Sequence, residues 1–497
     1  MKKYLLVIAL LTLSNNSYAA EMDHQHDNSE DSETMDHSKM DHSEHANMGD
    51  MQHSMSASTS ANAPMQRKGS GTGWLPDSSP MYAYYLEKDQ FSFMLHGNAH
   101  FRYNNQNPLN TGLGLRGGSQ FDVPNWFMLM AQTPINSKDR LTFSGMFSLD
   151  AFTVGGQGYP LLFQTGETWQ GKKLVDRQHP HDLFSELSLT YAYTINKDAN
   201  LFAYFGLPGE PALGPTAFMH RISSFNNPDS PLGHHWQDAT HITFGVFTLG
   251  GIYKNIKFDG SVFTGREPDE NRLNFDMPRF DSYSGRITYN PYQDLSVQAS
   301  YAYVKSPESL EPDENAHKVT ASVNHNKVFN NLENEYTNLA STFVWGMNGH
   351  AHNNEPIKAE NSFLLESELQ LWRKNFIYTR MEYVQKNSNE LNLNLTDNSS
   401  FNISALTIGA ARTLLNYKNT LLNLGGQMSF YLADSKVEQF YGKNPFAFQI
   451  YLRLTPDLMN MNMKKAETSN SEHDHHQMNK KEENDVQSED KHKEHQH

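Results

Sequence analysis

The chain has 497 residues, a formal net charge of −16 at pH 7 and no cysteine. The absence of thiols excludes disulfides and thiolate metal sites, and the acidic balance argues against nucleic acid as a partner. Hydrophobic residues make up 37% and aromatic residues 12%, and beyond the N-terminal leader no stretch reaches the roughly 18 consecutive apolar residues that a transmembrane helix needs.

The first twenty residues predict a secretory signal. Lys2 and Lys3 precede a short apolar run over residues 5–13, and the small-residue stretch SYAA follows at 17–20. This order is typical of a cleaved signal peptide, which we assign to residues 1–20. The apolar run is too short to span a bilayer.

Residues 21–70 form a tail that we expect to be disordered, because they carry almost no aliphatic or aromatic residues. Its stretch MDHSKMDHSEH (35–45) crowds thioether, imidazole and carboxylate groups together, and the same composition returns in a second tail, residues 457–497. Thioethers select Cu(I), whereas imidazole suits Cu(II), zinc and nickel. The mixture therefore predicts copper binding in both oxidation states, with silver as a second soft ion. The alternative is a solvated low-complexity linker. The predicted ligands are Met22, His24, His26, Met35, His37, Met40, His42, His45, Met48, Met51, His53, Met55, His473, His475, His476 and Met478.

Between the tails, residues 71–456 alternate with period two. In FSFMLHGNAHFRYN (91–104), Phe91 and Phe93 share one face and Ser92 and His96 the other. This pattern recurs between polar turns and longer loops, as in a membrane barrel. Strands are expected at 91–104, 119–134, 140–154, 184–196, 200–208, 238–250, 254–265, 282–290, 294–304, 316–326, 331–345, 360–373, 375–386, 401–415, 420–433 and 445–454. The prediction is an all-β, transmembrane, antiparallel outer-membrane β-barrel of about 16 strands; the alternative is a soluble β-sandwich.

Several histidines fall in the predicted loops. DRQHPHD holds His179 and His181, and GHHWQDATH holds His234, His235 and His241. Two further places are His220 upstream of that stretch and the pair His350 and His352. Each can bind a metal through neutral imidazole. The alternative, favoured slightly for the first two loops, is that they hold the loops together by hydrogen bonds.

An acidic wall is expected inside the barrel. The predicted hairpin around residues 373–375 places Glu368 opposite Arg380 and Glu366 opposite Glu382, all pointing inward. Glu333 and Glu335 on the preceding strand are predicted to point the same way. Facing like charges are destabilising unless a cation lies between them. A cation path and an internally paired lumen both remain open.

The Met/His-rich leader resembles that of the copper-resistance B-type outer-membrane proteins. The barrel looks more like a related group of copper-associated outer-membrane proteins of Gram-negative bacteria. The resemblance is carried by GSGTGWLPDSSPMY (69–82), FMLHGNAHFRY (93–103), DRQHPHDLFSELSLTYAY (176–193), FGLPGEPALGPTAFMHR (205–221) and NNPDSPLGHHWQDATHITFGV (226–246). It implies an exported barrel associated with copper tolerance, and it brings no catalytic role.

No catalytic fingerprint is present, so we do not expect an enzyme. The sequence predicts an outer-membrane barrel that binds copper through its tails and contributes to copper tolerance or copper passage. Outer-membrane lipid, metal ions and periplasmic copper-handling proteins are the expected partners. An even strand number puts both tails in the periplasm. The alternative is a general or substrate-specific porin in which the tails are incidental.

Overall fold

The computed structural model describes residues 55–352, 358–393, 395 and 400–459. All of them belong to one compact unit that spans residues 50–497. The predicted signal peptide, most of the N-terminal tail and nearly all of the C-terminal tail lie outside the described residues.

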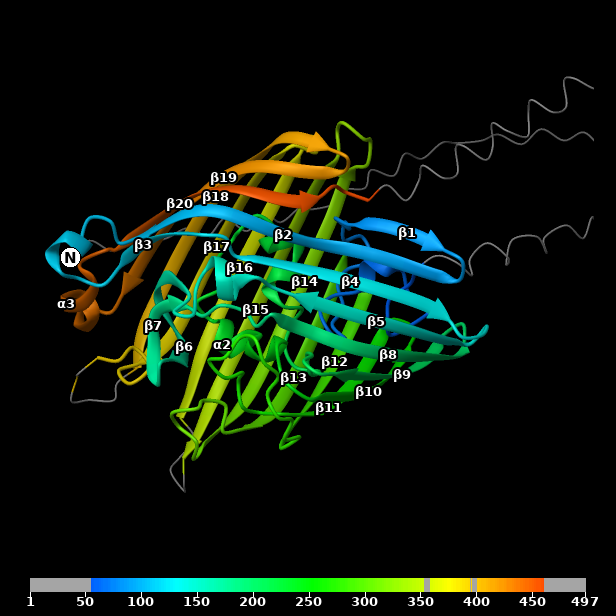
Figure 1. The fold of residues 1–497 in the computed structure, drawn as a ribbon, viewed down its shortest axis with the longest axis horizontal. Coiled ribbons are helices and arrows are strands. Elements are labelled where there is room, and N and C mark those ends of the chain that lie inside the picture. Colours follow the sequence, from blue (N-terminus) through cyan, green and yellow to red (C-terminus); the bar gives the residue numbers. More distant parts are fainter. Residues whose placement is uncertain (1–54, 353–357, 394, 396–399, 460–497) are drawn as a thin grey trace, which may run out of the picture. The chain divides into compact units, whose positions relative to one another are not determined.

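The described chain folds into a closed antiparallel barrel of 16 strands (Figure 1). Each strand pairs with the next along the chain, and the last pairs back with the first from Ala99↔Leu454 to Gln106↔Ala447. The barrel strands are β2 (Phe91–Gln106), β4 (Asn125–Pro134), β5 (Asp139–Phe147), β8 (Phe184–Asn196), β9 (Ala199–Gly206), β10 (Val246–Tyr253), β11 (Ile256–Phe263), β12 (Ser282–Tyr292), β13 (Leu295–Lys305), β14 (Glu314–Asn330), β15 (Thr337–His352), β16 (Lys358–Leu371), β17 (Asn375–Asn387), β18 (Ser400–Tyr417), β19 (Thr420–Ala433) and β20 (Phe446–Pro456). The predicted barrel is confirmed.

Two short strands complete the sheet where the barrel strands differ in length. β3 (Gly118–Asp122) pairs with the far half of β2 and leads into β4, which pairs with the near half. β1 (Tyr84–Lys88) pairs with the first residues of β2, which β20 does not reach. The edge that β2 would otherwise expose beside β20 is therefore covered, as a barrel requires.

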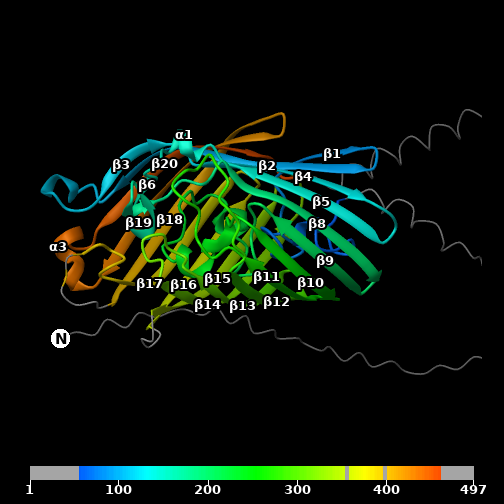
Figure 2. The same cartoon turned by 60° about the horizontal axis from the view of Figure 1, so that its bottom comes forward.

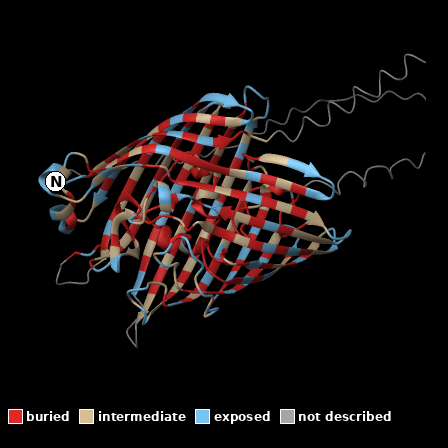
Figure 3. Cartoon of the chain, in the orientation of Figure 1, coloured by how far each residue is buried: buried red, intermediate tan, exposed pale blue. Residues whose placement is uncertain are grey.

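Buried and exposed residues alternate along the strands (Figure 3). The exposed residues are largely apolar and many of the buried ones are polar, so the barrel has an apolar outer face and a polar inner face. On β19 the exposed Leu424 and Phe430 alternate with the buried Asn423, Gln427 and Ser429. A soluble sandwich would bury the apolar face instead. This inverted pattern is that of a membrane barrel, so the sandwich alternative is wrong.

The connections differ in length at the two ends of the barrel. Residues 197–198, 254–255 and 418–419 are short turns, whereas residues 148–183 and 207–245 are long loops at the other end. The first and last described segments meet at the short-turn end, where the backbone N–H of Met459 donates to the carbonyl of Met81 over 2.8 Å. An even number of strands produces this arrangement.

The N-terminal segment 55–83 lies inside the barrel (Figure 2). The backbone N–H of Ser56 donates to Gln132 on β4 over 2.8 Å, and the Thr72 hydroxyl donates to Asp259 on β11 over 2.8 Å. Inward-pointing side chains of the barrel strands thus supply the hydrogen-bond partners of this segment, which has few apolar residues with which to form a core of its own. The ordered unit therefore begins by residue 55, and not at residue 71 as predicted.

The long loop 207–245 also enters the lumen and crosses the seam where the barrel closes. Its Asp229 accepts hydrogen bonds from Arg102 on β2 over 2.7 Å, from Gln427 on β19 over 2.8 Å and from Gln449 on β20 over 2.5 Å. One loop carboxylate thus joins both sides of the seam from within.

Short helices complete the fold. The α-helices are α1 (Asp150–Thr153), α2 (His234–Gln237) and α3 (Glu438–Tyr441), and the 3-10 helices are η2 (Met65–Arg67), η3 (Thr111–Leu113), η4 (Phe218–His220), η5 (Ile222–Ser224), η6 (Ala239–His241) and η7 (Ser435–Val437). None of the helices in the described part of the chain is long and apolar enough to cross a lipid bilayer.

The strand predicted at 238–250 is wrong in its first half. β10 begins only at Val246, and residues 234–241 form α2 and η6. Residues 240–246 are all buried, because the loop that holds them is surrounded by the barrel. A segment buried on every side has no period-two pattern to mark its boundary.

The predicted register between β16 and β17 is also wrong. It paired Glu368 with Arg380 and Glu366 with Glu382, but in the structure Glu366 lies opposite Arg380. The turn begins one residue earlier than predicted, at Trp372. A shift of one residue in a turn moves the pairing of the strands by two, which preserves the inward face.

The acidic wall is internally paired. Glu366 accepts from Arg221 of the inserted loop over 2.7 Å and from Arg380 over 2.9 Å. Glu333 and Glu335 were predicted to belong to the acidic wall, and this prediction is wrong. Both lie in the exposed turn before β15. The paired interpretation is therefore favoured over an open acidic path.

Candidate metal centre

Loop segments far apart in the sequence bring the histidines together at the long-loop end. The hairpin of β6 (Tyr159–Trp169) and β7 (Lys172–Gln178) ends one residue before His179, and α2 carries His234 and His235. α2 packs against β14, β15 and β16. The approach is close: a Cβ at Gly346 on β15 would lie 2.4 Å from the carbonyl oxygen of Trp236. Glycine at 346 thus allows α2 to lie on the sheet.

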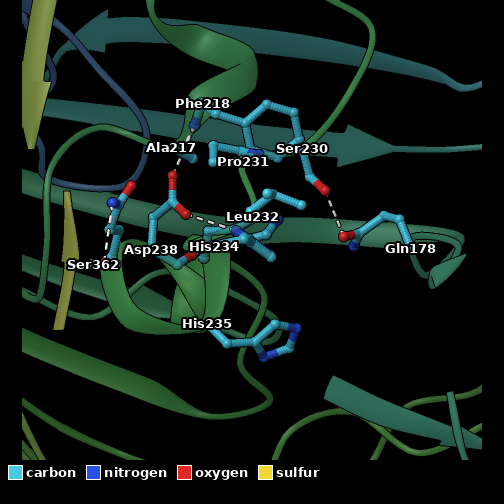
Figure 4. A network of polar contacts seen from close by, with 12 residues as sticks. Gln178, Ala217, Phe218, Ser230, Pro231, Leu232, His234, His235, Asp238 and Ser362 are labelled. Atoms are coloured by element: carbon cyan, nitrogen blue, oxygen red, sulfur yellow. Dashed lines mark hydrogen bonds and ion pairs between the residues drawn. The ribbon is translucent and has the colours of Figure 1, made fainter. Parts of the chain in front are cut away.

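Three buried imidazoles converge in this place. His179, His234 and His235 each offer one ring nitrogen, and these nitrogens all lie within 4.8 Å of one another. Figure 4 shows two of the rings on adjacent positions of α2. Three imidazole donors at such distances can bind one metal ion after small side-chain movements, because metal–nitrogen bonds are about 2.0–2.1 Å long.

Two more histidines extend the cluster. The ring centroid of His241 lies 5.0 Å from that of His234 and 5.8 Å from that of His181. The centroid of His181 lies 6.5 Å from that of His179. We call the five residues His179, His181, His234, His235 and His241 the histidine cluster.

Each ring of the histidine cluster is oriented through Nδ1. The hydrogen-bond partners are the carbonyl of Pro180 for His179 at 3.3 Å, Asp150 for His181 at 2.8 Å, Asp238 for His234 at 2.6 Å, Glu267 for His235 at 3.0 Å and the backbone carbonyl of Asp238 for His241 at 2.8 Å. A carboxylate oxygen of Glu167 also lies 3.1 Å from Nδ1 of His179. Metal-binding histidines are commonly held in this way, with one nitrogen on a carboxylate or carbonyl and the other on the metal. The prediction that these histidines hold the loops together by hydrogen bonds is thus correct for their Nδ1 atoms. Such bonds leave Nε2 of each ring as the atom that can bind a metal.

Burial disfavours the protonated form of three of these imidazoles. Burial, followed by the charge of Arg272, lowers the pKa of His179 well below its ordinary range. Burial also lowers the pKa of His234, although Asp238 opposes it, and lowers the pKa of His241 to about 3. Neutral imidazole is the form that binds metals.

Two second nitrogens have no partner. Among the described residues, Nε2 of His235 and Nε2 of His241 are buried without a hydrogen-bond partner. A buried polar atom left in this state is costly and calls for an explanation. His235 is one of the three histidines whose nitrogens converge, so its Nε2 is a candidate metal ligand.

A glycine fixes the position of one ring. Gly166 on β6 has φ +107°, and a Cβ there would lie 2.2 Å from the His235 ring. Any side chain at this position is both strained and in collision with the imidazole. The hairpin therefore packs against His235 only because residue 166 is glycine.

An acidic cavity of 390 Å³ adjoins the histidine cluster. Glu167, Glu267, Asp269 and Glu270 line it, and the first two also orient cluster histidines. Arg272 pairs with Glu167 and so offsets part of this charge. A cavity lined by one sign of charge concentrates counter-ions, which makes it a suitable approach for a cation.

The other predicted site residues are placed differently. The tail ligands lie outside the described residues except Met55, which is buried inside the barrel with 4% exposure. The His220 ring is tilted against Trp126, with ring centroids 4.6 Å apart, and is not one of the three histidines whose nitrogens converge. His350 contacts Glu314 on the neighbouring strand, and the side chain of His352 lies outside the described residues.

Comparison with known proteins concerns the fold. No family model matches the chain, and no curated protein matches its sequence. Among solved structures, OmpT of Vibrio cholerae without loop L8 shares 8% identity over 74% of this chain and 100% of its own, with a TM-score of 0.45. OmpF of Salmonella typhi in complex with daunomycin shares 11% identity over 74% of this chain and 100% of its own, with a TM-score of 0.45. The anion-selective porin from Comamonas acidovorans shares 11% identity over 73% of this chain and 99% of its own, with a TM-score of 0.45.

Proposed function

We propose that this protein is an outer-membrane barrel that binds copper and contributes to copper tolerance or to copper passage across the outer membrane. The observation that carries the proposal is the convergence of His179, His234 and His235, whose ring nitrogens lie within 4.8 Å of one another. Imidazole suits Cu(II), zinc and nickel alike. The thioether-rich tails of the same chain favour copper among these.

The membrane and its orientation are part of this proposal. The apolar outer face, the even strand number and the predicted signal peptide support an outer-membrane barrel. In such barrels the short turns face the periplasm. Because the described chain begins and ends at the short-turn end, both Met/His-rich tails are proposed to lie in the periplasm, within reach of periplasmic copper-handling proteins.

Cysteine labelling tests this orientation, since the chain contains no other cysteine. Ser38→Cys and Ser469→Cys are each treated, in intact cells, with a maleimide too large to cross the outer membrane. We expect no labelling until the membrane is permeabilised. Labelling of either position in intact cells would contradict the periplasmic placement.

Cu(II) binding tests the histidine cluster. The full chain and the double variant His179→Asn, His235→Asn are refolded in detergent and loaded with Cu(II) by equilibrium dialysis. We expect the double variant to bind one Cu(II) fewer and to lose one nitrogen-rich component of the electron paramagnetic resonance spectrum. The tails are unchanged in both proteins, so their copper cancels in the difference.

His325→Asn is the matched control. This histidine lies half-buried on the outer face of β14, away from the histidine cluster. It should bind copper as the unchanged protein does. Equal stoichiometry and spectra in all three proteins would remove the observation on which the proposal rests.

The alternative is a porin whose tails are incidental, and the barrel fold is compatible with it. Segments 55–83 and 207–245 occupy the lumen, so we expect a small single-channel conductance in planar bilayers. A large conductance that copper leaves unchanged would favour the porin over the copper-binding barrel.

A further inference from the structure

Methionines gather inside the barrel, and of these only Met55 belongs to the predicted copper ligands. The buried members are Met55, Met65, Met94, Met128, Met130 and Met146, together with Ala83 and Trp126. Met81, Met219 and Met459 pack against them. We call the nine methionines the methionine cluster; the whole chain has 22 methionines.

The methionine cluster occupies inward positions that barrels normally give to polar residues. Met94 on β2, Met128 and Met130 on β4 and Met146 on β5 all point away from the outer face. Methionine also fills irregular gaps in ordinary cores. A ligand role therefore needs an observation beyond composition.

A cavity supplies that observation. It has a volume of 60 Å³ and lies within the methionine cluster. The residues that line it include Met81, Met94, Met128, Met130 and Met219, together with His96. A space of this size admits an ion, since a water molecule needs only about 10–15 Å³ by the same measure.

Nitrogen and aromatic groups complete the lining. Nε2 of His96 is buried and has no hydrogen-bond partner among the described residues. The His96 ring centroid lies 5.3 Å from that of Trp126 and 5.7 Å from that of His220, and both of these residues also line the cavity. An indole face attracts a desolvated cation.

Two cationic side chains in the lining, Lys68 and Arg221, oppose a cation. The charge of Arg221 is offset by its ion pairs with Asp238 and Glu366. Lys68 lines the cavity and donates from Nζ to the Ser144 hydroxyl over 3.1 Å. Burial lowers its pKa to about 8, while the charge of Glu186 acts in the other direction. This ammonium group weakens cation binding but does not fill the cavity.

We propose that this cavity is a binding site for a soft monovalent cation, Cu(I) or Ag(I), held by methionine thioethers and the free nitrogen of His96. Thioethers select Cu(I) over the divalent metals. The inference rests on the proposed copper function, which it deepens by assigning one oxidation state to a place within the lumen.

The position of the cavity suits a relay between the tails and the histidine cluster. A cavity of 890 Å³ at the short-turn end is lined by Met55 and Met459, the first and last described residues. On the other side, Trp126 and Met219 also line a cavity of 40 Å³ that reaches His181. Thioether and imidazole ligands thus follow one another through the lumen.

Ag(I) is the test probe, because it resembles Cu(I) and needs no reductant. All six tryptophans lie in the barrel and none in the tails, so tryptophan fluorescence of the full chain is insensitive to silver bound by the tails. We expect saturable quenching that is absent in Trp126→Phe. In the double variant Met94→Leu, Met128→Leu the apparent affinity should fall by roughly tenfold or more, since even outer-shell partners are worth about 10- to 100-fold.

Met146→Leu is the matched control. Met146 is buried in the methionine cluster with 4% exposure but does not line the cavity. It should leave the quenching curve unchanged. Leucine nearly conserves the volume of methionine, and such exchanges usually cost less than about 1.5 kcal/mol. The urea midpoint of each variant checks folding, and single Met94→Leu replaces the double variant if that one does not fold.

Three outcomes overturn the inference. The first is quenching that does not depend on Trp126. The second is that the Met94→Leu variants bind Ag(I) as tightly as the unchanged chain. The third is that Met146→Leu loses as much affinity for Ag(I) as the Met94→Leu variants do. The last outcome would show that the methionines only pack. The Cu(II) experiment on His179 and His235 is separate, so silver binding without the Cu(II) difference would leave the cavity standing while the proposed function fails.

Discussion

Acid should destabilise this protein through His241, and the variant His241→Asn isolates the effect. Burial, together with His234 and His181, lowers the pKa of His241 from 6.5 to about 3, and its Nε2 has no partner in the described residues. Asparagine retains a side-chain N–H where Nδ1 donates to the carbonyl of Asp238, but it does not titrate.

The sign and size follow from proton linkage. Below pH 6.5 the unfolded chain binds a proton at His241 that the folded protein does not bind until about pH 3. The free energy of unfolding therefore falls as the pH falls. Between pH 8 and pH 5 the loss is about 2 kcal/mol, since the interval below 6.5 is about 1.5 units and each unit is worth about 1.4 kcal/mol.

The assay is urea unfolding in detergent, followed by tryptophan fluorescence at pH 8 and pH 5. The unchanged protein should lose about 2 kcal/mol more than His241→Asn between the two pH values. His325→Asn, on the outer face of β14, should behave like the unchanged protein. An equal loss in the unchanged protein and His241→Asn would refute the reasoning, because it would show that His241 does not remain neutral in the folded state.

Other expectations concern charge and packing. Glu366→Gln should destabilise the barrel by about 3–5 kcal/mol in the same urea assay, because it leaves two buried arginines without their shared carboxylate; Glu333→Gln, in an exposed turn, should have almost no effect. Gly166→Ala should abolish the proposed binding of Cu(II) at the histidine cluster by displacing His235, and unchanged stoichiometry would show that the loop adapts. Lys68→Gln should tighten Ag(I) binding by about 3- to 10-fold in the fluorescence titration, since a like charge is removed; weaker binding would mean that Lys68 supports the cavity.

The barrel could be predicted from sequence because its strands repeat one signal. Each strand alternates between lipid and lumen, so sixteen segments report the same architecture and a local error does little harm. The wrong register at Glu366 shows the limit of this signal. Period two fixes the face of a residue, but the partner across the hairpin depends on where the turn begins.

The centre of the molecule was less accessible to sequence reasoning. His179 and His234 are 55 positions apart in the chain, and only the inward folding of loop 207–245 brings their rings together. Residues 55–70 carry the composition of a tail and yet pack inside the barrel, because their partners belong to the strands. The one available signal for the methionine cluster was Met94 and Met146 on the inward face, and this pattern also suits ordinary packing.

The single carboxylate at the seam has a consequence for assembly. Asp229 belongs to the loop between β9 and β10, yet its partners lie on β2, β19 and β20. These partners come together only when the last strand reaches the first. Asp229 therefore gains all three partners only in the closed barrel, and its hydrogen bonds favour closure over an open sheet. Nascent chains in which Asp229 is replaced should accumulate as open, protease-sensitive sheets at the insertion machinery, even if the finished barrel tolerates the change.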